Sequence, residues 1–336
     1  MALLSRIIPI SSTDLSQTGN ARRQALSLAT QMDFDELRQG QLSIIVTEVA
    51  RNIEAHGGGG EVILSAWTHG NMSGIDVLGL DKGKGIASVS EALQDGYSTA
   101  GTPGNGLGAI SRLSGTFQIY TAPGNGAAVF SRVLRTAQEA ETESSAFPMS
   151  AISVPIAGES RCGDSWSAEF TPGRSRYIMA DGLGHGPLAA EAADEAVRIF
   201  HQLPHYAPER ILSEIHGALG KTRGAAVSVL EILADREVLN YAGTGNIVAA
   251  ICSGAKIRSL VSMNGTVGHS IGRIQQFSYP WETGSTLVMH SDGLATRWNV
   301  EQYPGLLSRH PALLAGVLFR DFCRKRDDAT ILVTRI

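Results

Sequence analysis

The chain has 336 residues, of which 43% are hydrophobic and 18% charged, with a formal net charge of −4 at pH 7 and a pI near 6.1. This length exceeds one ordinary core and the composition is that of a globular protein, so two domains are expected and a disordered chain is excluded. The acidic balance and the scattered Lys and Arg residues offer no basic surface for nucleic acid.

The opening ten residues are too short and too interrupted for a signal peptide, and their alternation predicts a first strand. No apolar run approaches the ~20 residues of a membrane-spanning helix. The cysteines Cys162, Cys252 and Cys323 show no C-x-x-C spacing, which agrees with a reducing compartment. A cytoplasmic protein with no membrane partner is therefore expected.

Residues 41–56 have the periodicity of an amphipathic helix, with Leu42, Ile45 and Val49 on one side. On another side Glu48 and Asn52 are four residues apart, so both side chains point the same way.

Apolar strands are expected next at residues 61–67 and 74–80, and the second runs into the motif Asp81-Lys82-Gly83-Lys84-Gly85. Further on, a glycine-rich stretch at residues 101–108 opens a helix at residue 109. A glycine-rich loop that leads into a helix N-terminus is a suitable phosphate cradle. Taken singly these motifs are weak, because E-x-x-x-N occurs by chance and such stretches are more often flexible loops.

In this order, the motifs resemble the GHKL ATP-binding fold. Within it the chain is similar to the RsbT/RsbW group of anti-sigma and switch kinases, through Thr47-Glu48-Val49-Ala50-Arg51-Asn52-Ile53 and the glycines at 57–60. The resemblance implies that Asn52 holds the Mg²⁺ bridging the ATP phosphates and that Asp81 accepts the adenine amino group. It also implies glycines that shape the adenine pocket, Gly83 and Gly85, and glycines of a lid, Gly104, Gly106 and Gly108.

Glu48 occupies the position of the base that, in this group, activates a serine or threonine hydroxyl of a protein for attack on the γ-phosphate. Lys84 departs from the pattern, since many relatives have proline there, and a solvated side chain is favoured over a phosphate contact. Arg51 and Lys82 could neutralise phosphate charge. Arg51 is equally able to pair with Glu48 or Glu54.

The domain boundary is expected at residues 136–150, which are polar, acidic and free of periodic apolar residues. Closing strands of the first domain are expected at 116–120 and 127–133, and a new sheet begins at residue 152. The predicted organisation is a first domain at 1–135, a linker at 136–150 and a second domain at 151–336.

In the second domain, residues 187–203 and 208–219 have helical periodicity. Strand-like runs accompany them, at residues 225–233, 238–241, 247–252, 286–289 and 330–333. Strands with flanking helices predict an α/β sandwich.

Several acidic turns occur along this half of the chain. They are Gly163-Asp164, Asp181-Gly182-Leu183-Gly184-His185-Gly186, Ser291-Asp292-Gly293 and Asp327-Asp328-Ala329-Thr330. Each adjoins a strand-like run, so a sheet core can deliver all of these carboxylates to one end. One Asp-Gly pair alone would be as well explained by a hairpin turn. Together they favour a hard-cation site for Mg²⁺ or Mn²⁺ rather than Zn²⁺, and two such ions ~4 Å apart suit phosphoester hydrolysis.

The second half also contains the motif Ala242-Gly243-Thr244-Gly245-Asn246, which follows a predicted strand. Together with the acidic turns, this motif resembles the SpoIIE/RsbX branch of the metal-dependent, PPM-type serine/threonine phosphatases. The resemblance implies that Asp181 bridges two metals with help from the Gly182 carbonyl, and that Asp292 and Asp327 complete the second ion. Asp164 matches the family's first acidic position, which acts directly or through a metal-bound water. The expected fold class is a two-domain α/β (α+β) protein, a GHKL-type α/β sandwich followed by a PPM-type β-sandwich flanked by helices.

His185 has two interpretations: a general acid toward the leaving serine oxygen, or a cap for the helix that begins near Pro187. Cys162 is favoured as a small buried residue over a reactive thiolate. A cysteine phosphatase is therefore disfavoured, in agreement with a family mechanism that forms no phosphoenzyme.

Together the resemblances imply a bifunctional partner-switching regulator, with Mn²⁺ or Mg²⁺ in the phosphatase and ATP with Mg²⁺ in the kinase. One domain would add, and the other remove, phosphate on a STAS-domain protein, either an anti-sigma antagonist or a stressosome-type protein. A sigma-factor regulator, a downstream phosphatase and a second copy of the chain stay open as further partners. In one alternative the first domain binds ATP without catalysis and regulates the fused phosphatase. In another the phosphatase half is a degenerate scaffold, against which its acidic positions argue.

Overall fold

The computed structural model describes residues 5–14, 16–70, 72–94, 106–136, 149–254 and 256–336, and the chain divides into two compact units. One unit groups the described residues up to 136 with residues 302–321, and the other groups residues 149–301 with 322–336. Most of the expected linker, like Gly104, lies outside the described residues. In the described part of the chain, no helix is long and apolar enough to cross a membrane.

The first unit is built on an antiparallel sheet in the order β1-β2-β3-β5-β4. Its strands are β1 (Ser5–Ile10), β2 (Gly60–His69), β3 (Met72–Asp81), β4 (Thr116–Thr121) and β5 (Ala127–Leu134). The sequence predicted all of these strands, from alternation of apolar side chains or from short strand-like runs.

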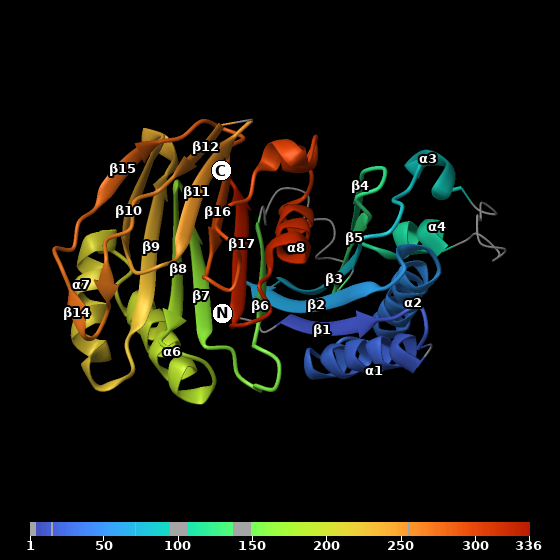
Figure 1. Cartoon of the computed structure of the whole chain (residues 1–336), viewed down its shortest axis with the longest axis horizontal. Helices are drawn as coiled ribbons and strands as arrows, with labels where there is room; N and C mark the ends of the chain where they lie inside the picture. The colour runs from blue at the N-terminus through green and yellow to red at the C-terminus, as the bar shows by residue number, and fades with distance from the viewer. Residues whose placement is uncertain (1–4, 15, 71, 95–105, 137–148, 255) are drawn as a thin grey trace. The chain divides into compact units, whose positions relative to one another are not determined.

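Helices α1 (Ser16–Gln31), α2 (Glu36–Asn52) and α4 (Gly106–Leu113) pack along one face of this sheet (Figure 1). Helix α2 begins before the predicted residue 41 because Asp35 caps it, accepting a 2.7 Å hydrogen bond from the Arg38 backbone N–H. It continues into a π-helical turn, Ile53–Gly57. The sequence did not predict α1, whose buried side chains are mostly alanines and therefore give a weak apolar signal. A short helix, α3 (Val89–Ala92), follows β3.

The opposite face of the same sheet packs against α8 (Pro311–Phe322), which comes from the far end of the chain. Because strand residues alternate between faces, Gly79 meets Val49 of α2, whereas Leu78 and Leu80 lie against Gly316 of α8. The rings of Phe130 and His310 stack with centroids 4.3 Å apart. Residues 302–321, expected within the second domain, thus pack with the first unit.

The second unit contains two five-stranded sheets, ordered β15-β10-β9-β8-β7 and β12-β11-β16-β17-β6. The first consists of β7 (Asp164–Thr171), β8 (Arg174–Gly182), β9 (Ala225–Leu233), β10 (Val238–Thr244) and β15 (Phe277–Pro280). The second consists of β6 (Met149–Val154), β11 (Val248–Ser253), β12 (Lys256–Ser259), β16 (Thr286–His290) and β17 (Ala329–Arg335). A short hairpin, β13 (Gly265–Thr266) with β14 (Ser270–Ile271), completes the unit.

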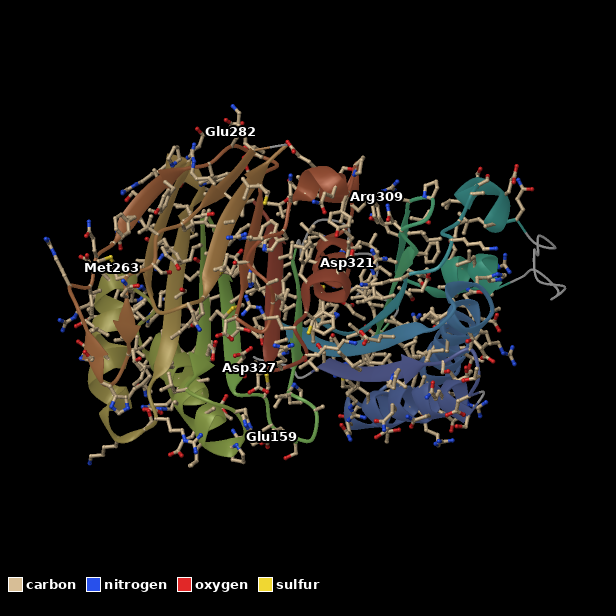
Figure 2. The ribbon with its side chains drawn as sticks, viewed as in Figure 1. Glu159, Met263, Glu282, Arg309, Asp321 and Asp327 are labelled. Atoms are coloured by element: carbon tan, nitrogen blue, oxygen red, sulfur yellow. The ribbon has the colours of Figure 1, made fainter. Side chains whose placement is uncertain are left out.

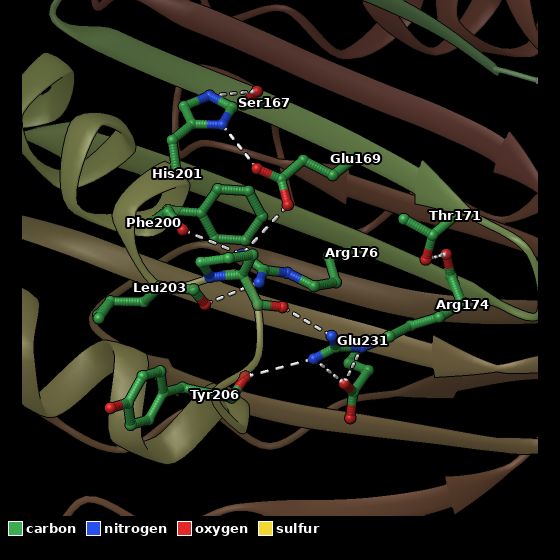
Figure 3. A network of polar contacts seen from close by, with 11 residues as sticks. Ser167, Glu169, Thr171, Arg174, Arg176, Phe200, His201, Leu203, Tyr206 and Glu231 are labelled. Atoms are coloured by element: carbon green, nitrogen blue, oxygen red, sulfur yellow. Dashed lines mark hydrogen bonds and ion pairs between the residues drawn. The ribbon is translucent and has the colours of Figure 1, made fainter.

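Helices α6 (Pro187–Gln202) and α7 (Pro208–Ala218) cover the β7–β10 sheet, close to the predicted bounds (Figure 1). From the other face of that sheet, the buried Tyr177 hydroxyl reaches Thr334 of β17 at 3.4 Å. The C-terminal carbonyls of α6 accept hydrogen bonds from Arg176 on β8, to Phe200 at 3.0 Å and Leu203 at 2.8 Å (Figure 3). The chain is thus a mixed α/β protein, with a sheet sandwich in its second unit.

Candidate functional site

The acidic turns of the second unit meet at one end of its two sheets. Asp164 and Asp181 face each other directly in the pairing of β7 with β8. Asp292 follows β16, and Asp327 precedes the adjacent antiparallel strand β17, so both lie at the same end of the second sheet. The hydroxyl of Ser291 joins the two sheets by donating to Asp164 Oδ2 at 2.6 Å.

These carboxylates disfavour one another's ionisation. Burial, together with the charges of Asp164, Asp292, Asp327 and Asp328, raises the pKa of Asp181 to about 9. Burial likewise raises the pKa of Asp164 to about 7, against the hydrogen bond from Ser291. The pKa of Asp292 is also raised, by burial and by Asp327. A bound cation would remove this penalty, because it lets all the carboxylates ionise together.

The donor set fits a hard divalent cation. All the converging groups are carboxylates, and the buried Asp164 Oδ1 has no hydrogen-bond partner within the described residues, although buried polar atoms are normally paired. Among the described residues, no three acidic, His or Cys side chains stand close enough to share one ion directly. Their strand ends nevertheless lie at one end of the two sheets. Coordination of a cation would therefore be completed by water or by small side-chain movements, as Mg²⁺ commonly requires.

The adjacent aspartates 327 and 328 have different surroundings. Asp328 is buried, and its two carboxylate oxygens accept backbone N–H groups from Ile156 and Gly163, both at 2.8 Å. Asp328 therefore clamps both ends of the loop between β6 and β7. The carboxylate of Asp327 accepts only the N–H of Asp328, at 2.9 Å, among the hydrogen bonds of the described residues. Sequence reasoning missed this clamp because neighbouring aspartates look alike in a sequence.

The turn after Asp181 depends on glycine. A Cβ at Gly182 would lie 2.0 Å from the carbonyl oxygen of Ala189, and Gly184 and Gly186 have φ of 84° and 76°. Helix α6 starts at Pro187 without a side-chain cap, so the capping interpretation of His185 has no support. The His185 ring instead contacts Glu159, with Nδ1 and Oε1 2.7 Å apart.

Cys162, beside this site, is buried. Burial and the Asp164 charge raise the pKa of its thiol far above the usual range. The thiol stays protonated at neutral pH, which agrees with the interpretation of Cys162 as a small buried residue.

In the first unit, Glu48 and Asn52 of α2 lie beside the start of α4. A Cβ on Gly106 would be 2.9 Å from Glu48 Oε2 and 3.6 Å from Asn52 Oδ1. The Asn52 Nδ2 atom is buried and has no partner among the described residues. Arg51 Nη1 pairs with Glu48 Oε1 at 3.1 Å, whereas Glu54 accepts the Thr18 hydroxyl.

Asp81, at the end of β3, is held by the glycine motif that follows it. Its Oδ1 accepts the N–H groups of Gly83 at 2.8 Å and Ala127 at 3.2 Å. A Cβ on Gly83 would come within 2.5 Å of the His56 carbonyl oxygen, and Gly85 has a φ of 76°. These positions therefore require glycine, and the Lys84 side chain between them is exposed. Gly108 is buried within α4.

Comparisons with known proteins find similarity in both halves of the chain. The family model described as Stage II sporulation protein E (SpoIIE) matches residues 171–336. Phosphoserine phosphatase RsbX of Bacillus subtilis (strain 168) is 27% identical over 139 residues, 41% of this chain and 69% of RsbX. Serine/threonine-protein kinase RsbT of the same organism is 28% identical over 106 residues, 32% of this chain and 80% of RsbT.

A solved structure described as "The bacterial stressosome: a modular system that has been adapted to control secondary messenger signaling" is similar with a TM-score of 0.53 and 23% identity. It covers 56% of this chain and 100% of its own, and at this identity the likeness concerns the fold alone. The family model and the RsbX relative support a SpoIIE-type phosphatase domain in the second half of the chain.

Proposed function

We propose that the second unit is a divalent-metal-dependent phosphatase that removes phosphate from phosphoserine or phosphothreonine of a protein. The convergence of Asp164, Asp181, Asp292 and Asp327, with the pKa values of the first three raised, carries this proposal. Asp181, Asp292 and Asp327, with the Gly182 carbonyl, would hold Mn²⁺ or Mg²⁺. Asp164 would act directly or through water. When bound, the ions supply Lewis acidity and an activated water.

The chain's own residues hold this arrangement in place. Ser291 fixes one oxygen of Asp164 and leaves the other open. Asn246 orients Asp292 through a 2.6 Å hydrogen bond to Oδ2. His185 lies exposed beside the cluster and would give a proton to the leaving serine oxygen.

The proposed protein substrate is a STAS-domain protein of a partner-switching system. Similarity to a relative named phosphoserine phosphatase supports the phosphoserine part of this assignment. The STAS-domain part rests on the resemblance to the RsbT/RsbW and SpoIIE/RsbX groups. Dephosphorylation in one unit and phosphorylation in the other would set the phosphorylation level of that substrate.

For the first unit we propose a GHKL-type ATP-binding domain with serine/threonine kinase activity. Its support is the RsbT relative, the unpaired buried Asn52 amide and the glycine-dependent turn around Asp81. Kinase activity requires Glu48 to leave Arg51, because the ion pair at 3.1 Å engages the carboxylate that would accept the hydroxyl proton. That ion pair favours the second candidate, in which this unit binds ATP without catalysis and regulates the phosphatase.

Transfer of ³²P from ATP to a STAS-domain protein distinguishes these two candidates. A kinase labels the protein, and Glu48→Ala abolishes labelling while ATP binding persists. A binding module gives no labelling in either form.

ATP binding itself is checked by calorimetry on Gly83→Ala, whose new Cβ meets the His56 carbonyl and weakens binding at least about tenfold. The control is Gly40→Ala in α2, which meets nothing within 4 Å and leaves ATP affinity unchanged. Equal ATP affinity in both variants would contradict the nucleotide site.

A further inference from the structure

His185 and Glu159 form a pair beside the acidic cluster. The Nδ1 atom of His185 is 2.7 Å from Glu159 Oε1, and the side chains are 57% and 27% exposed, so a bound substrate can reach them. Within the described residues, Nδ1 is the only ring nitrogen of His185 that is hydrogen-bonded. Its Nε2 is therefore available to a ligand.

The loop that carries Glu159 is fixed by the same clamp that borders the acidic site. Asp328 holds Ile156 and Gly163 on either side of Glu159. A Cβ on Gly186 would lie 2.8 Å from Glu159 Oε2, so glycine at that position lets the carboxylate approach the turn after Asp181. Figure 2 shows Glu159 and Asp327 toward the same end of the unit.

A second pair, His201 with Glu169, has the same 2.7 Å separation but different surroundings (Figure 3). The Nε2 of His201 bonds the Ser167 hydroxyl at 3.1 Å, and Glu169 also pairs with Arg176 at 3.4 Å. Both nitrogens of that ring are occupied, so the pair is structural. It lies about 15 Å from Asp164 along β7, at a rise of ~3.3 Å per residue.

We propose that Glu159 is a positioning residue for His185: it accepts the Nδ1 proton, so that a protonated Nε2 faces the leaving oxygen. This rests on the proposed phosphatase function. A water oxygen bonds to phosphorus as the bond from phosphorus to the serine oxygen breaks. The serine oxygen takes the Nε2 proton, and the imidazolium becomes a neutral imidazole that keeps its Nδ1–H on Glu159. The surplus proton of the water passes to solvent, which later reprotonates Nε2.

Leaving-group chemistry tests this proposal. A serine alkoxide needs a proton to depart, whereas p-nitrophenolate departs readily without one, so a general acid matters more for phosphoserine. Turnover of a phosphoserine peptide and of p-nitrophenyl phosphate is measured with Mn²⁺ for the whole chain and for Glu159→Gln and His185→Gln. The ratio of the two kcat values is expected to fall about tenfold in Glu159→Gln and about a hundredfold in His185→Gln. Glu159→Asp is expected to recover part of the loss.

Glu169→Gln is the matched control, because it breaks a pair of equal length away from the acidic cluster, and its kcat ratio stays that of the unmodified chain. Equal losses on both substrates in Glu159→Gln, or no loss on either, would overturn the positioning role. Absence of Mn²⁺-dependent turnover in the unmodified chain would instead contradict the proposed phosphatase.

A separate observation concerns the end of α8. Arg320 is almost buried and donates from Nη1 to the backbone carbonyl of Asp81 at 2.8 Å. Asp321 pairs with Lys82 at 3.3 Å and accepts the Tyr303 hydroxyl at 2.8 Å. The end of this segment is thus bonded to the backbone at the proposed adenine position.

The residues that follow are bonded to the turn that carries Asp292. The carbonyl of Phe322 accepts the N–H of Ala295 at 2.9 Å, and the N–H of Arg324 donates to the carbonyl of Gly293 at 2.8 Å. A few consecutive residues therefore connect the backbone of Asp81 to the backbone beside Asp292.

We infer that residues 302–324 transmit nucleotide occupancy at Asp81 to the acidic cluster, so that a bound nucleotide changes phosphatase turnover. This also rests on the proposed function of both units. Such transmission requires that the Asp292 turn have two arrangements and that the nucleotide bind one of them more tightly. The contacts of Arg320 and Asp321 are where that difference would arise.

The test measures p-nitrophenyl phosphate turnover at fixed free Mn²⁺, with and without saturating ADP, while calorimetry follows ADP binding. ADP is expected to change turnover by about threefold or more in the unmodified chain. In Arg320→Ala that change shrinks below about 1.5-fold although ADP still binds. Arg198→Ala, which breaks an exposed ion pair on α6, keeps the full ADP effect.

The coupling would be overturned by a full ADP effect in Arg320→Ala, or by an unmodified chain that binds ADP without any change in turnover. An unmodified chain that binds no ADP would remove the nucleotide site itself. One that shows no turnover with Mn²⁺ would contradict the phosphatase.

Discussion

At the scale of single residues, the candidate site is a set of similar side chains in unequal surroundings. The flanking strands predicted a cation site at the acidic turns, and the resemblance to the phosphatases assigned Asp164, Asp181, Asp292 and Asp327 to it. The structure brings these residues to one end of the sheets. Their metal-binding roles stay predictions. Pattern alone could not reveal Glu159 or the clamp of Asp328, because both depend on contacts between loops distant in sequence.

Asp181→Asn tests the electrostatic account. The amide is neutral without taking up a proton, whereas Asp181 must take one up on folding at neutral pH, so without metal the variant is expected to melt about 2–6 °C higher than the unmodified chain. Its Mn²⁺-dependent turnover is expected to be lost, since a proposed metal ligand is gone. Thermal unfolding in EDTA and a phosphatase assay measure the two effects. A lower melting temperature together with retained turnover would contradict both assignments.

The pH dependence of stability follows from the same groups. The pKa values of Asp164 and Asp181 are raised in the folded chain to about 7 and about 9, from 3.8. The metal-free folded state therefore keeps protons that the unfolded chain releases, and this contribution, full below pH 4, is lost as pH rises through those values. Melting in EDTA is expected to occur at a lower temperature at pH 8 than at pH 5, and Mn²⁺ is expected to reverse the loss at pH 8. Equal melting temperatures in EDTA would count against the shifts.

At the scale of elements, the spacing of apolar residues predicted many of the strands and the amphipathic helices. The predicted bounds of β9, β16 and α6 lie within a residue of those observed, because β9 and β16 are short runs buried almost throughout and α6 buries one consistent face. Helix α1 was missed because alanines form its buried stripe. Helix α8 was missed too: it is apolar nearly all round, so its sequence shows no preferred face.

Asp327 and Asp328, which immediately precede β17, are expected to have different roles. Asp328→Ala leaves the N–H groups of Ile156 and Gly163 without their acceptor, so the free energy of unfolding is expected to fall by about 2–4 kcal/mol. Asp327→Asn is expected to keep the stability of the unmodified chain and lose Mn²⁺-dependent turnover. Urea unfolding and the phosphatase assay separate the two. Equal destabilisation by both substitutions would show that the hydrogen bonds of Asp328 to the loop between β6 and β7 do not stabilise the fold specifically.

At the scale of the whole molecule, the chain interleaves its two units in sequence. Residues 302–321 pack with the first unit although residues on both sides of them belong to the second. Composition predicted two domains and the acidic stretch at 136–150 suggested where they meet. No local pattern could show that a later segment returns to the first sheet, because that contact depends on the tertiary fold. Residues 302–321 are therefore joined by the chain at both ends to residues of the second unit while they pack with the first.

Phosphate release from a phosphoserine protein by the whole chain tests the central claim most directly. The assay compares the unmodified chain with Asp181→Asn, each with Mn²⁺ and with EDTA, after circular dichroism has shown that both are folded. The account predicts release only by the unmodified chain and only with Mn²⁺, and a decrease of about a hundredfold or more in Asp181→Asn. Equal release by both proteins, or release that persists in EDTA, would contradict a metal-dependent phosphatase at this site.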